Sequence, residues 1–346
     1  MLVAVAVLLT LLAILFSITN SVTKTVLFTS TKIDAFGSSR AAFELMSQKL
    51  SQATLNSYWD YDNPAAPTVY YRQSDLQFLV KQNTQNGGYG QEVYFVTPAA
   101  YSTDSTIRST AGLLNACGYF IEYSGNTNFR PGSVTTTKYR YRLMQGMEPT
   151  ESLAVYRGWP LVPLTAATDT ASVIQTKWTT YWGNWATFWA TPTWINNISN
   201  AGTGTLKSSV APLADNIIAL VVWPRLSSVD NPAGTKLTTN YTYDSQKNAL
   251  TTPQPLTANQ LPPTVQITMI VISEASAVRL DTHSVTPPTA IENALKNGAS
   301  TRFTDPTKYQ ADLTAIGSAL AASGITYEVF STSVTMKESK WSDNSQ

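Results

Sequence analysis

The sequence predicts an α+β fold in which a long N-terminal helix packs on a largely antiparallel, β-rich globular head. Three observations lead to this prediction. Residues 1–23 contain no charged side chain, apolar residues recur at helical spacing from there to about residue 56, and beyond Pro64 the apolar period changes to two. We therefore expect two parts, a helix over residues 1–56 and a head over residues 57–346.

The first half of the expected helix has the composition of a membrane span. Its first sixteen residues are apolar except for Thr10. At about 1.5 Å per residue, a helix over residues 1–23 is roughly 34 Å long, close to the hydrocarbon thickness of a bilayer. A cleaved secretory signal and a buried core helix are the alternatives, but no basic start, Ala-x-Ala cleavage site or polar face is visible. We expect a retained single span that includes Leu2, Val5, Leu8, Leu11 and Leu15.

The second half of the expected helix is amphipathic. Residues 20–56 contain no proline and only one glycine, Gly37, where a bend is expected. One apolar stripe has members three, four or seven residues apart, and we take it as the helix-packing interface: Val22, Val26, Ile33, Phe36, Phe43, Met46 and Leu50. The simplest prediction is one continuous helix of about 55 residues, roughly 80 Å long, whose second half lies against the head.

The head is predicted to be rich in strands. The segment from Tyr58 to Pro64 ends the helix, because proline and clustered Asp and Asn residues disfavour its continuation. Period-two or β-branched runs predict strands at residues 76–80, 93–95, 119–123, 138–143, 217–222, 239–243, 265–272 and 327–334. One later helix is well marked, with Asp305 as its N-cap, Pro306 in its first turn and Gly324 after its end.

Composition limits the possible partners. The chain has 23 basic and 22 acidic residues, a net charge of +1, so no basic face for nucleic acid is expected. Its polarity comes largely from Thr, Ser, Asn, Gln and aromatic residues, as in β-rich proteins that work outside the cytoplasm. The single cysteine, Cys117, cannot form an internal disulfide. We expect it to be a small buried residue at a strand start, with an exposed reactive thiol as the alternative.

An aromatic cluster at residues 178–194 contains five of the nine tryptophans, at helical spacing. Three interpretations stay open. The rings could pack on the sheet as part of the core, they could form a carbohydrate-stacking platform, or they could contact another protein subunit, since Trp and Tyr are enriched at interface hot spots. The candidate partner surface consists of Trp178, Trp182, Trp185 and Trp189.

Residues for catalysis or metal binding are scarce. The only histidine, His283, lies in an expected surface loop without a G-x-S-x-G element nearby. One histidine and one cysteine cannot fill a tetrahedral zinc shell. The Asp60-Tyr61-Asp62-Asn63 run lacks the glycine and distant glutamate of a helix-loop-helix calcium site, so we expect a solvated turn there. We therefore expect no catalytic residue, metal, cofactor or small-molecule substrate, although paired carboxylates on strand ends are neither indicated nor excluded.

Several segments carry a family resemblance. The apolar start MLVAVAVLLTLLAIL, which runs into an amphipathic half containing RAAFE at residues 40–44 and then a β-rich head, resembles the type IV pilin-like proteins, in particular the larger minor pseudopilins of type II secretion. More narrowly, five segments look like the Verrucomicrobia-type prepilin-like family named Verru_Chthon cassette protein C: LSQATLNSYWDYD (50–62), PTESLAVY (149–156), LADNIIAL (213–220), EASAVRL (274–280) and KWS (340–342).

The resemblance implies a non-enzymatic structural subunit. It would sit in inner-membrane lipid with a periplasmic head and pack helix against helix with other pilin-like subunits in a pilus-like or secretion filament. Family members carry a basic leader, a Gly-Phe type processing site and a glutamate ahead of a run like residues 2–5, so we expect the translation start to lie upstream of Met1. The alternative is a copy without the leader, which the prepilin peptidase could not process and which would lack the glutamate used in filament assembly. Two alternatives stay open: a membrane-anchored periplasmic binding module that holds glycans through the aromatic cluster, and an anchored hydrolase.

Overall fold

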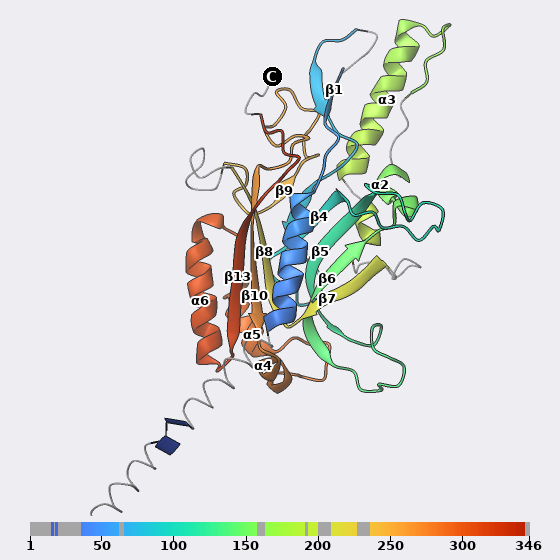
Figure 1. Cartoon of the computed structure of the whole chain (residues 1–346). Coiled ribbons are helices and arrows are strands. Elements are labelled where there is room, and N and C mark those ends of the chain that lie inside the picture. Colours follow the sequence, from blue (N-terminus) through green and yellow to red (C-terminus); the bar gives the residue numbers. More distant parts are fainter. Residues whose placement is uncertain are drawn as a thin grey trace, which may run out of the picture.

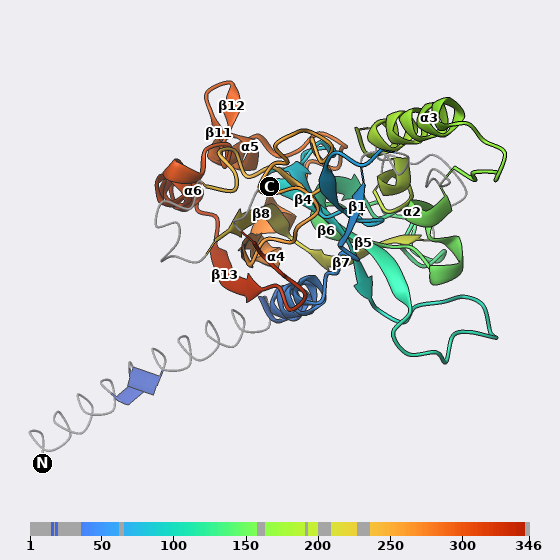
Figure 2. The same cartoon turned by 90° about the horizontal axis from the view of Figure 1, so that it is seen from above.

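The computed structural model describes residues 15, 16, 18, 19, 36–61, 66–157, 163–190, 193–199, 209–226 and 236–342. Over these residues the protein is a β-rich α+β fold built on two antiparallel sheets (Figure 1). Viewed from above in Figure 2, the helices α3 and α6 lie on opposite sides of the sheets. Two short hairpins complete the strands.

The order of neighbouring strands defines each sheet. The larger sheet has the order β7 (Val210–Asp215), β6 (Tyr139–Met147), β5 (Leu114–Gly125), β4 (Gln91–Pro98), β3 (Leu79–Gln82) and β9 (Tyr243–Asp244). The smaller sheet has the order β13 (Tyr327–Thr335), β10 (Thr264–Ile272) and β8 (Ile217–Arg225). The hairpins pair β1 (Tyr58–Tyr61) with β2 (Tyr70–Gln73), and β11 (Lys296–Asn297) with β12 (Ser300–Thr301).

The first continuous helix of the described chain covers residues 36–51. The other α-helices are α2 (Ala154–Arg157), α3 (Ala171–Ala190), α4 (Glu274–Arg279), α5 (Thr289–Leu295) and α6 (Tyr309–Ala322). Short 3-10 turns are η1 (Thr150–Ser152), η2 (Thr193–Asn197) and η4 (Pro306–Lys308).

The two sheets meet at Gly90. This residue forms a parallel bridge with Leu220 of β8, and the Leu220 N–H donates to the Tyr89 carbonyl at 3.3 Å. The backbone of Gly90 has φ +86°, and a Cβ atom there would lie 1.9 Å from the Leu220 carbonyl oxygen. Only glycine fits this contact, because it has no Cβ and tolerates a positive φ.

Two cores lie on opposite faces of the larger sheet. Val93 and Phe95 of β4 point into the main core, which lies between the sheets and also takes in α5, α6 and the helix over residues 36–51. Tyr94 and Val96 point the other way into a second core under α3. The alternation of side chains along a strand explains why β4 is buried on both faces.

The prediction of one continuous N-terminal helix of about 55 residues is wrong. The first continuous helix of the described residues begins at residue 36 and has 16 residues, and none of the helices in the described segments is long and apolar enough to cross a bilayer. The helix over residues 36–51 is apolar on one face only, with Arg40 and Glu44 exposed on the other, which suits packing on a sheet. The longest helix of the described residues, α3, has 20 residues but exposes the polar side chains of Gln175, Thr179 and Asn184.

The same finding contradicts the expected single-pass inner-membrane placement. Of the predicted span, Leu2, Val5, Leu8 and Leu11 lie outside the described residues, and Leu15 is helical and exposed.

Several predicted elements of the head are confirmed. Asp305 accepts a hydrogen bond from the Thr307 N–H at the start of η4, α6 follows, and Gly324 has φ +64° after its end. Cys117 is buried early in β5, as expected. The strand predicted at residues 239–243 is wrong except at Tyr243, because residues 239–241 form bends and Tyr241 has a positive φ.

Candidate functional site

The tryptophans of α3 belong largely to the second core. Trp178, Trp185 and Trp189 are buried there against residues such as Tyr94, and Trp182 is half-buried. Ring contacts link the helix turns, with Trp182 and Trp185 edge to face at 5.9 Å. Of the four tryptophans predicted as a partner surface, Trp182 alone is therefore partly accessible.

The apolar stripe of the helix over residues 36–51 is also used inside the chain. Phe36, Phe43, Met46 and Leu50 are buried in the main core, and the Phe43 ring lies 5.9 Å from the ring of Phe330 in β13. The other members of the predicted helix-packing interface, Val22, Val26 and Ile33, lie outside the described residues.

Within residues 36–342, the most exposed aromatic side chains that the structure describes lie on the β1–β2 hairpin. Its register places Trp59 opposite Arg72 and Tyr61 opposite Tyr70. Because side chains alternate along a strand, these four residues share one face of the hairpin. Trp59 is 53% exposed and Tyr70 54% exposed. The guanidinium of Arg72 lies 5.5 Å from the Trp59 ring centre, and the rings of Tyr61 and Tyr70 are 4.9 Å apart. We call these four residues the hairpin face.

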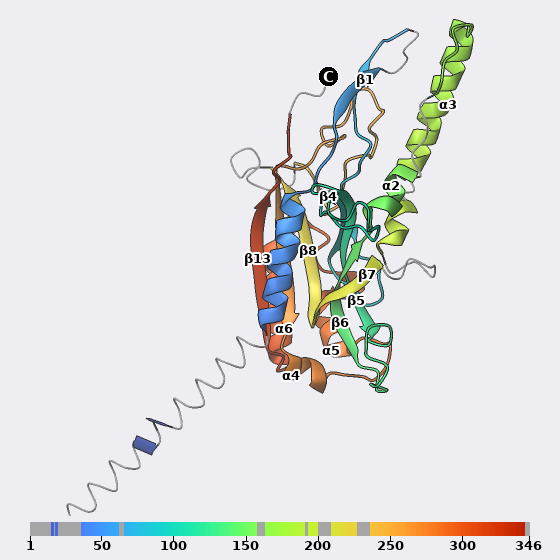
Figure 3. The same ribbon diagram turned by 45° about the vertical axis from the view of Figure 1, so that its right-hand side comes forward.

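The hairpin projects from one end of the body, beside α3 (Figures 1 and 3). Its opposite face is turned toward that helix. Burial and then the carboxylates of Asp60 and Asp75 raise the pKa of Tyr181 in α3 to about 12. The hydroxyl of Tyr58 in β1 donates to Asp75 at 2.9 Å, and burial and this carboxylate raise its pKa as well. Tyr58 and Asp60 thus lie on the face near α3, and the hairpin face lies on the other side of the two strands.

Backbone contacts hold the second strand of the hairpin rigidly. The Arg72 N–H donates to Gln254 Oε1 at 3.0 Å, and Gln254 Nε2 donates to the Arg72 carbonyl at 2.7 Å. Arg72 Nη1 reaches the Ala258 carbonyl at 3.3 Å. Burial lowers the pKa of this guanidinium, although it stays charged. The hairpin face is therefore held in position before any partner arrives.

A hollow of about 320 Å³ opens beside the hairpin face. Trp59 and Arg72 line one part of it, and Gln260, Glu338 and Lys340 line another. This volume lies at the lower end of the range for small-ligand sites. The lining mixes polar and charged side chains with apolar ones such as Leu55 and Leu261, whereas small-ligand sites are mostly apolar.

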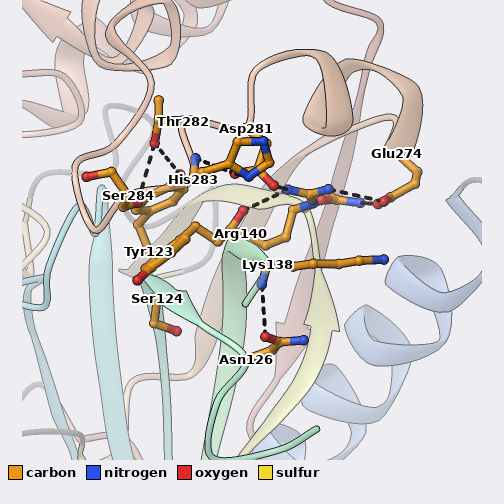
Figure 4. Close-up of polar contacts among 12 residues, drawn as sticks. Tyr123, Ser124, Asn126, Lys138, Arg140, Glu274, Asp281, Thr282, His283 and Ser284 are labelled. Carbon is orange, nitrogen blue, oxygen red and sulfur yellow. Dashed lines mark hydrogen bonds and ion pairs between the residues drawn. The ribbon is translucent and has the colours of Figure 1, made fainter. Parts of the chain in front are cut away.

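A separate polar cluster surrounds Arg140 of β6 (Figure 4). Its buried guanidinium pairs with Asp281 at 2.8 Å and with Glu274 at 3.5 Å, and Asn216 Nδ2 donates to Glu274 at 2.6 Å. Burial acts to raise the pKa of Asp281, but the hydrogen bond from the His283 N–H and the charge of Arg140 outweigh it, so this pKa lies below its ordinary range. The cluster ties the larger sheet to α4 and the loop that follows it.

The surroundings of His283 do not form a hydrolytic triad. Its side chain is 80% exposed and lies 3.6 Å from Asp281. The neighbouring hydroxyls bond elsewhere, Thr282 Oγ1 to the Thr286 carbonyl and Ser284 Oγ to Thr286 Oγ1. Within the described segments, no three His, Cys, Asp or Glu residues are grouped so that they could hold a metal ion. Asp60 accepts a hydrogen bond from the Tyr61 N–H, and Asp62 and Asn63 lie outside the described residues.

Comparisons with protein-family models, with curated proteins and with solved structures find no match. The hairpin face was not indicated by the sequence pattern, which we interpreted at residues 58–64 as the end of a helix. A signal was present, since Tyr58-Trp59-Asp60-Tyr61 and Tyr70-Tyr71-Arg72 are two aromatic runs separated by a turn-rich segment.

Proposed function

We propose that the protein is a non-enzymatic structural subunit that assembles with further copies of itself, and that the hairpin face is one of its contact surfaces. The observation that carries this proposal is the group of exposed rings of Trp59, Tyr61 and Tyr70 beside the half-buried Arg72 on one face of the hairpin. An assembling subunit is also what the pilin-like resemblance implies. The proposal does not include the membrane anchor, which the described helices contradict.

The composition of the hairpin face favours a protein partner. Trp, Tyr and Arg are the residue types most enriched at the energetic centres of protein interfaces. Aromatic side chains offer a large contact area, and binding immobilises only a few of their rotatable bonds. Because the backbone of Arg72 is already fixed by Gln254, little further ordering is needed when a partner binds.

A glycan-binding module is the second candidate, and the hollow beside Trp59 favours it. An exposed indole next to amide, carboxylate and ammonium groups, here Gln260, Glu338 and Lys340, offers both a stacking plane and hydrogen-bond partners for a sugar ring. The four predicted tryptophans of α3 do not offer such a platform, because three of them are buried.

Sedimentation velocity of the purified full chain tests the proposal. We expect the native protein to form species larger than a dimer, and the double variant Trp59→Ala, Tyr70→Ala to lose them, because the centre of the contact is removed. Tyr101→Ala is the matched control, since it removes an aromatic ring that is 38% exposed elsewhere on the surface.

Equal assembly of the double variant and the native chain would overturn the proposed role of the hairpin face. The glycan candidate has its own readout, retention on immobilised polysaccharide. Retention that the Trp59→Ala change abolishes, in a chain that does not self-associate, would replace the proposed function by a binding function.

A further inference from the structure

The strand β13 is the free edge of the smaller sheet. It pairs with β10 over nine residues without a register shift, and the order β13-β10-β8 leaves its other side without a strand among the described residues. Figure 3 shows β13 at the outer boundary of the sheet, with α6 behind it and the helix over residues 36–51 in front.

The direction of each backbone group in β13 follows from the bonds at its two ends. The Ser273 N–H donates to the Thr326 carbonyl at 2.9 Å, and the Met336 N–H donates to the Pro263 carbonyl at 3.0 Å. Residues 326 and 336 therefore point their backbone groups toward β10. In an antiparallel pair this direction alternates from one residue to the next. The N–H and C=O groups of five residues consequently point outward: Tyr327, Val329, Ser331, Ser333 and Thr335. No hydrogen bond from another described residue reaches these outward groups.

The other edges of the two larger sheets are protected. The edge strand β7 contains Pro212 and an irregular register beside β6, and the edge strand β9 has only two residues. The outer side of β8 is joined to the larger sheet through Gly90. Proline, bulges, short length and cover are the usual means by which proteins block strand addition.

β13 has none of these devices within its nine residues. Its sequence, YEVFSTSVT, has one charged side chain, Glu328, and no lysine or proline. Both faces of the strand make contacts within the chain. On one face Phe330 contacts Phe43. On the other face the Ser331 hydroxyl shares a hydrogen bond with the Thr268 hydroxyl, which also bonds Tyr309 of α6. The hydrogen-bonding edge of the strand is therefore the part that can pair with another strand.

We propose that β13 pairs antiparallel with β13 of a second copy, about a twofold axis at Ser331. In this register Ser331 faces Ser331, Val329 faces Ser333 and Tyr327 faces Thr335, so every outward residue meets an outward residue. Each of the five opposed pairs exchanges two hydrogen bonds. Glu328 lies opposite Val334 of the second copy, so the two carboxylates do not oppose each other.

This self-complementarity identifies a second copy as the partner. A twofold interface requires one surface to match itself. The backbone groups of β13 match at several antiparallel registers, and the one centred on Ser331 pairs all five outward residues while keeping the two Glu328 carboxylates apart. The result is a continuous six-stranded sheet across the dimer. The inference rests on the proposed assembly function and adds to it the identity and geometry of one contact.

Position-specific disulfide formation tests the register. The only native cysteine, Cys117, is fully buried, so an introduced cysteine is the one accessible thiol in the described part of the chain. At the axis, two residues in a hydrogen-bonded pair have Cα atoms about 5.5 Å apart, within disulfide range. With Ser333→Cys, each introduced cysteine faces Val329 of the second copy. The two cysteines then lie four residues apart along the strands, about 14 Å, which is too far for a disulfide. Under mild oxidation we expect Ser331→Cys to give a covalent dimer and Ser333→Cys to give none.

Two further variants test the pairing itself. Ser333→Pro removes an outward N–H that β10 does not use, so the fold should survive in circular dichroism while sedimentation equilibrium shows loss of the strand-paired dimer. Ser333→Ala keeps the N–H and should pair like the native chain. If the proline variant unfolds, Val329→Lys places a charge on the same edge and should give the same loss of dimer.

The inference is overturned if Ser331→Cys forms no dimer, or if Ser333→Cys cross-links equally well. Its failure is distinguishable from that of the proposed function, because the double variant Trp59→Ala, Tyr70→Ala leaves β13 intact. Ser331→Cys should cross-link equally in that background. Cross-linking there, together with a native chain that never exceeds a dimer, would support the β13 contact and reject the hairpin face.

Discussion

Replacement of Gly90 by alanine should separate the two sheets at the point where they join. An alanine Cβ would lie 1.9 Å from the Leu220 carbonyl oxygen, so the two backbones must move apart by more than 1 Å to reach ordinary contact. That movement weakens the hydrogen bond from the Leu220 N–H to the Tyr89 carbonyl, at 3.3 Å, and the one from the Val222 N–H to Gln91 Oε1, at 3.1 Å. Both donors belong to a buried strand.

The size of the effect follows from two contributions. Holding a non-glycine residue at φ +86° costs about 1 kcal/mol. A buried donor left without its acceptor costs about 1–3 kcal/mol, and two donors are affected, each in part. We therefore expect Gly90→Ala to lower the free energy of unfolding by about 3–5 kcal/mol, a large share of the stability of a typical domain.

Urea unfolding followed by far-ultraviolet circular dichroism measures this loss. Gly112→Ala is the matched control, because Gly112 has φ +78° but nothing lies within 4 Å of its added Cβ. The control should lose about 1 kcal/mol from the backbone alone. Equal losses in the two variants would refute the role of Gly90 as the junction between the sheets.

Two further substitutions and one labelling experiment probe other parts of the molecule. Trp185→Ala empties a buried site in the second core and should lower the free energy of unfolding by about 3–5 kcal/mol in the same urea assay. Asp281→Asn removes the close partner of buried Arg140 while Glu274 remains, and should cost about 2–3 kcal/mol at neutral pH. The pKa of Asp281 is lowered in the folded protein, so its ionised carboxylate stabilises the fold above the unfolded pKa of about 3.9. This stabilisation is lost as the pH falls through the folded pKa. The unfolding curves of the native protein and of Asp281→Asn should therefore converge in acid. Burial raises the pKa of the Cys117 thiol to about 12, so a maleimide reagent should label it in urea and not in the native protein, as mass spectrometry would show.

Local sequence patterns predicted the elements whose ends and secondary structure are set by residues within the element itself. The start of α6 is marked by Asp305 and its end by Gly324, and β10 is rich in β-branched residues, which favour a strand. The helical spacing of the tryptophans predicted α3, but whether the rings face a core or a partner depends on what the rest of the chain brings to them. That information lies in Leu79 and Tyr94, about a hundred residues earlier.

The N-terminal prediction failed for a different physical reason. A stripe at helical spacing is compatible with one long helix or with a shorter one that packs on a sheet, because the spacing reports which residues share a face and not where the helix begins. In the described chain the stripe from Phe36 to Leu50 is occupied by the protein's own core. The junction at Gly90 and the open edge of β13 were not predictable in this way either, since both depend on which strands become neighbours.

A twofold contact through β13 closes on itself and yields a dimer that cannot extend. Longer assemblies therefore need a second, separate surface, and the hairpin face lies at one end of the body while β13 runs along its side (Figure 1). If both contacts operate, Ser333→Pro alone and the double variant Trp59→Ala, Tyr70→Ala alone should each leave only small, finite oligomers. The combination of all three changes should leave monomers, and sedimentation velocity distinguishes these sizes. Large assemblies that persist in the combined variant would mean that neither surface is the one through which this subunit grows.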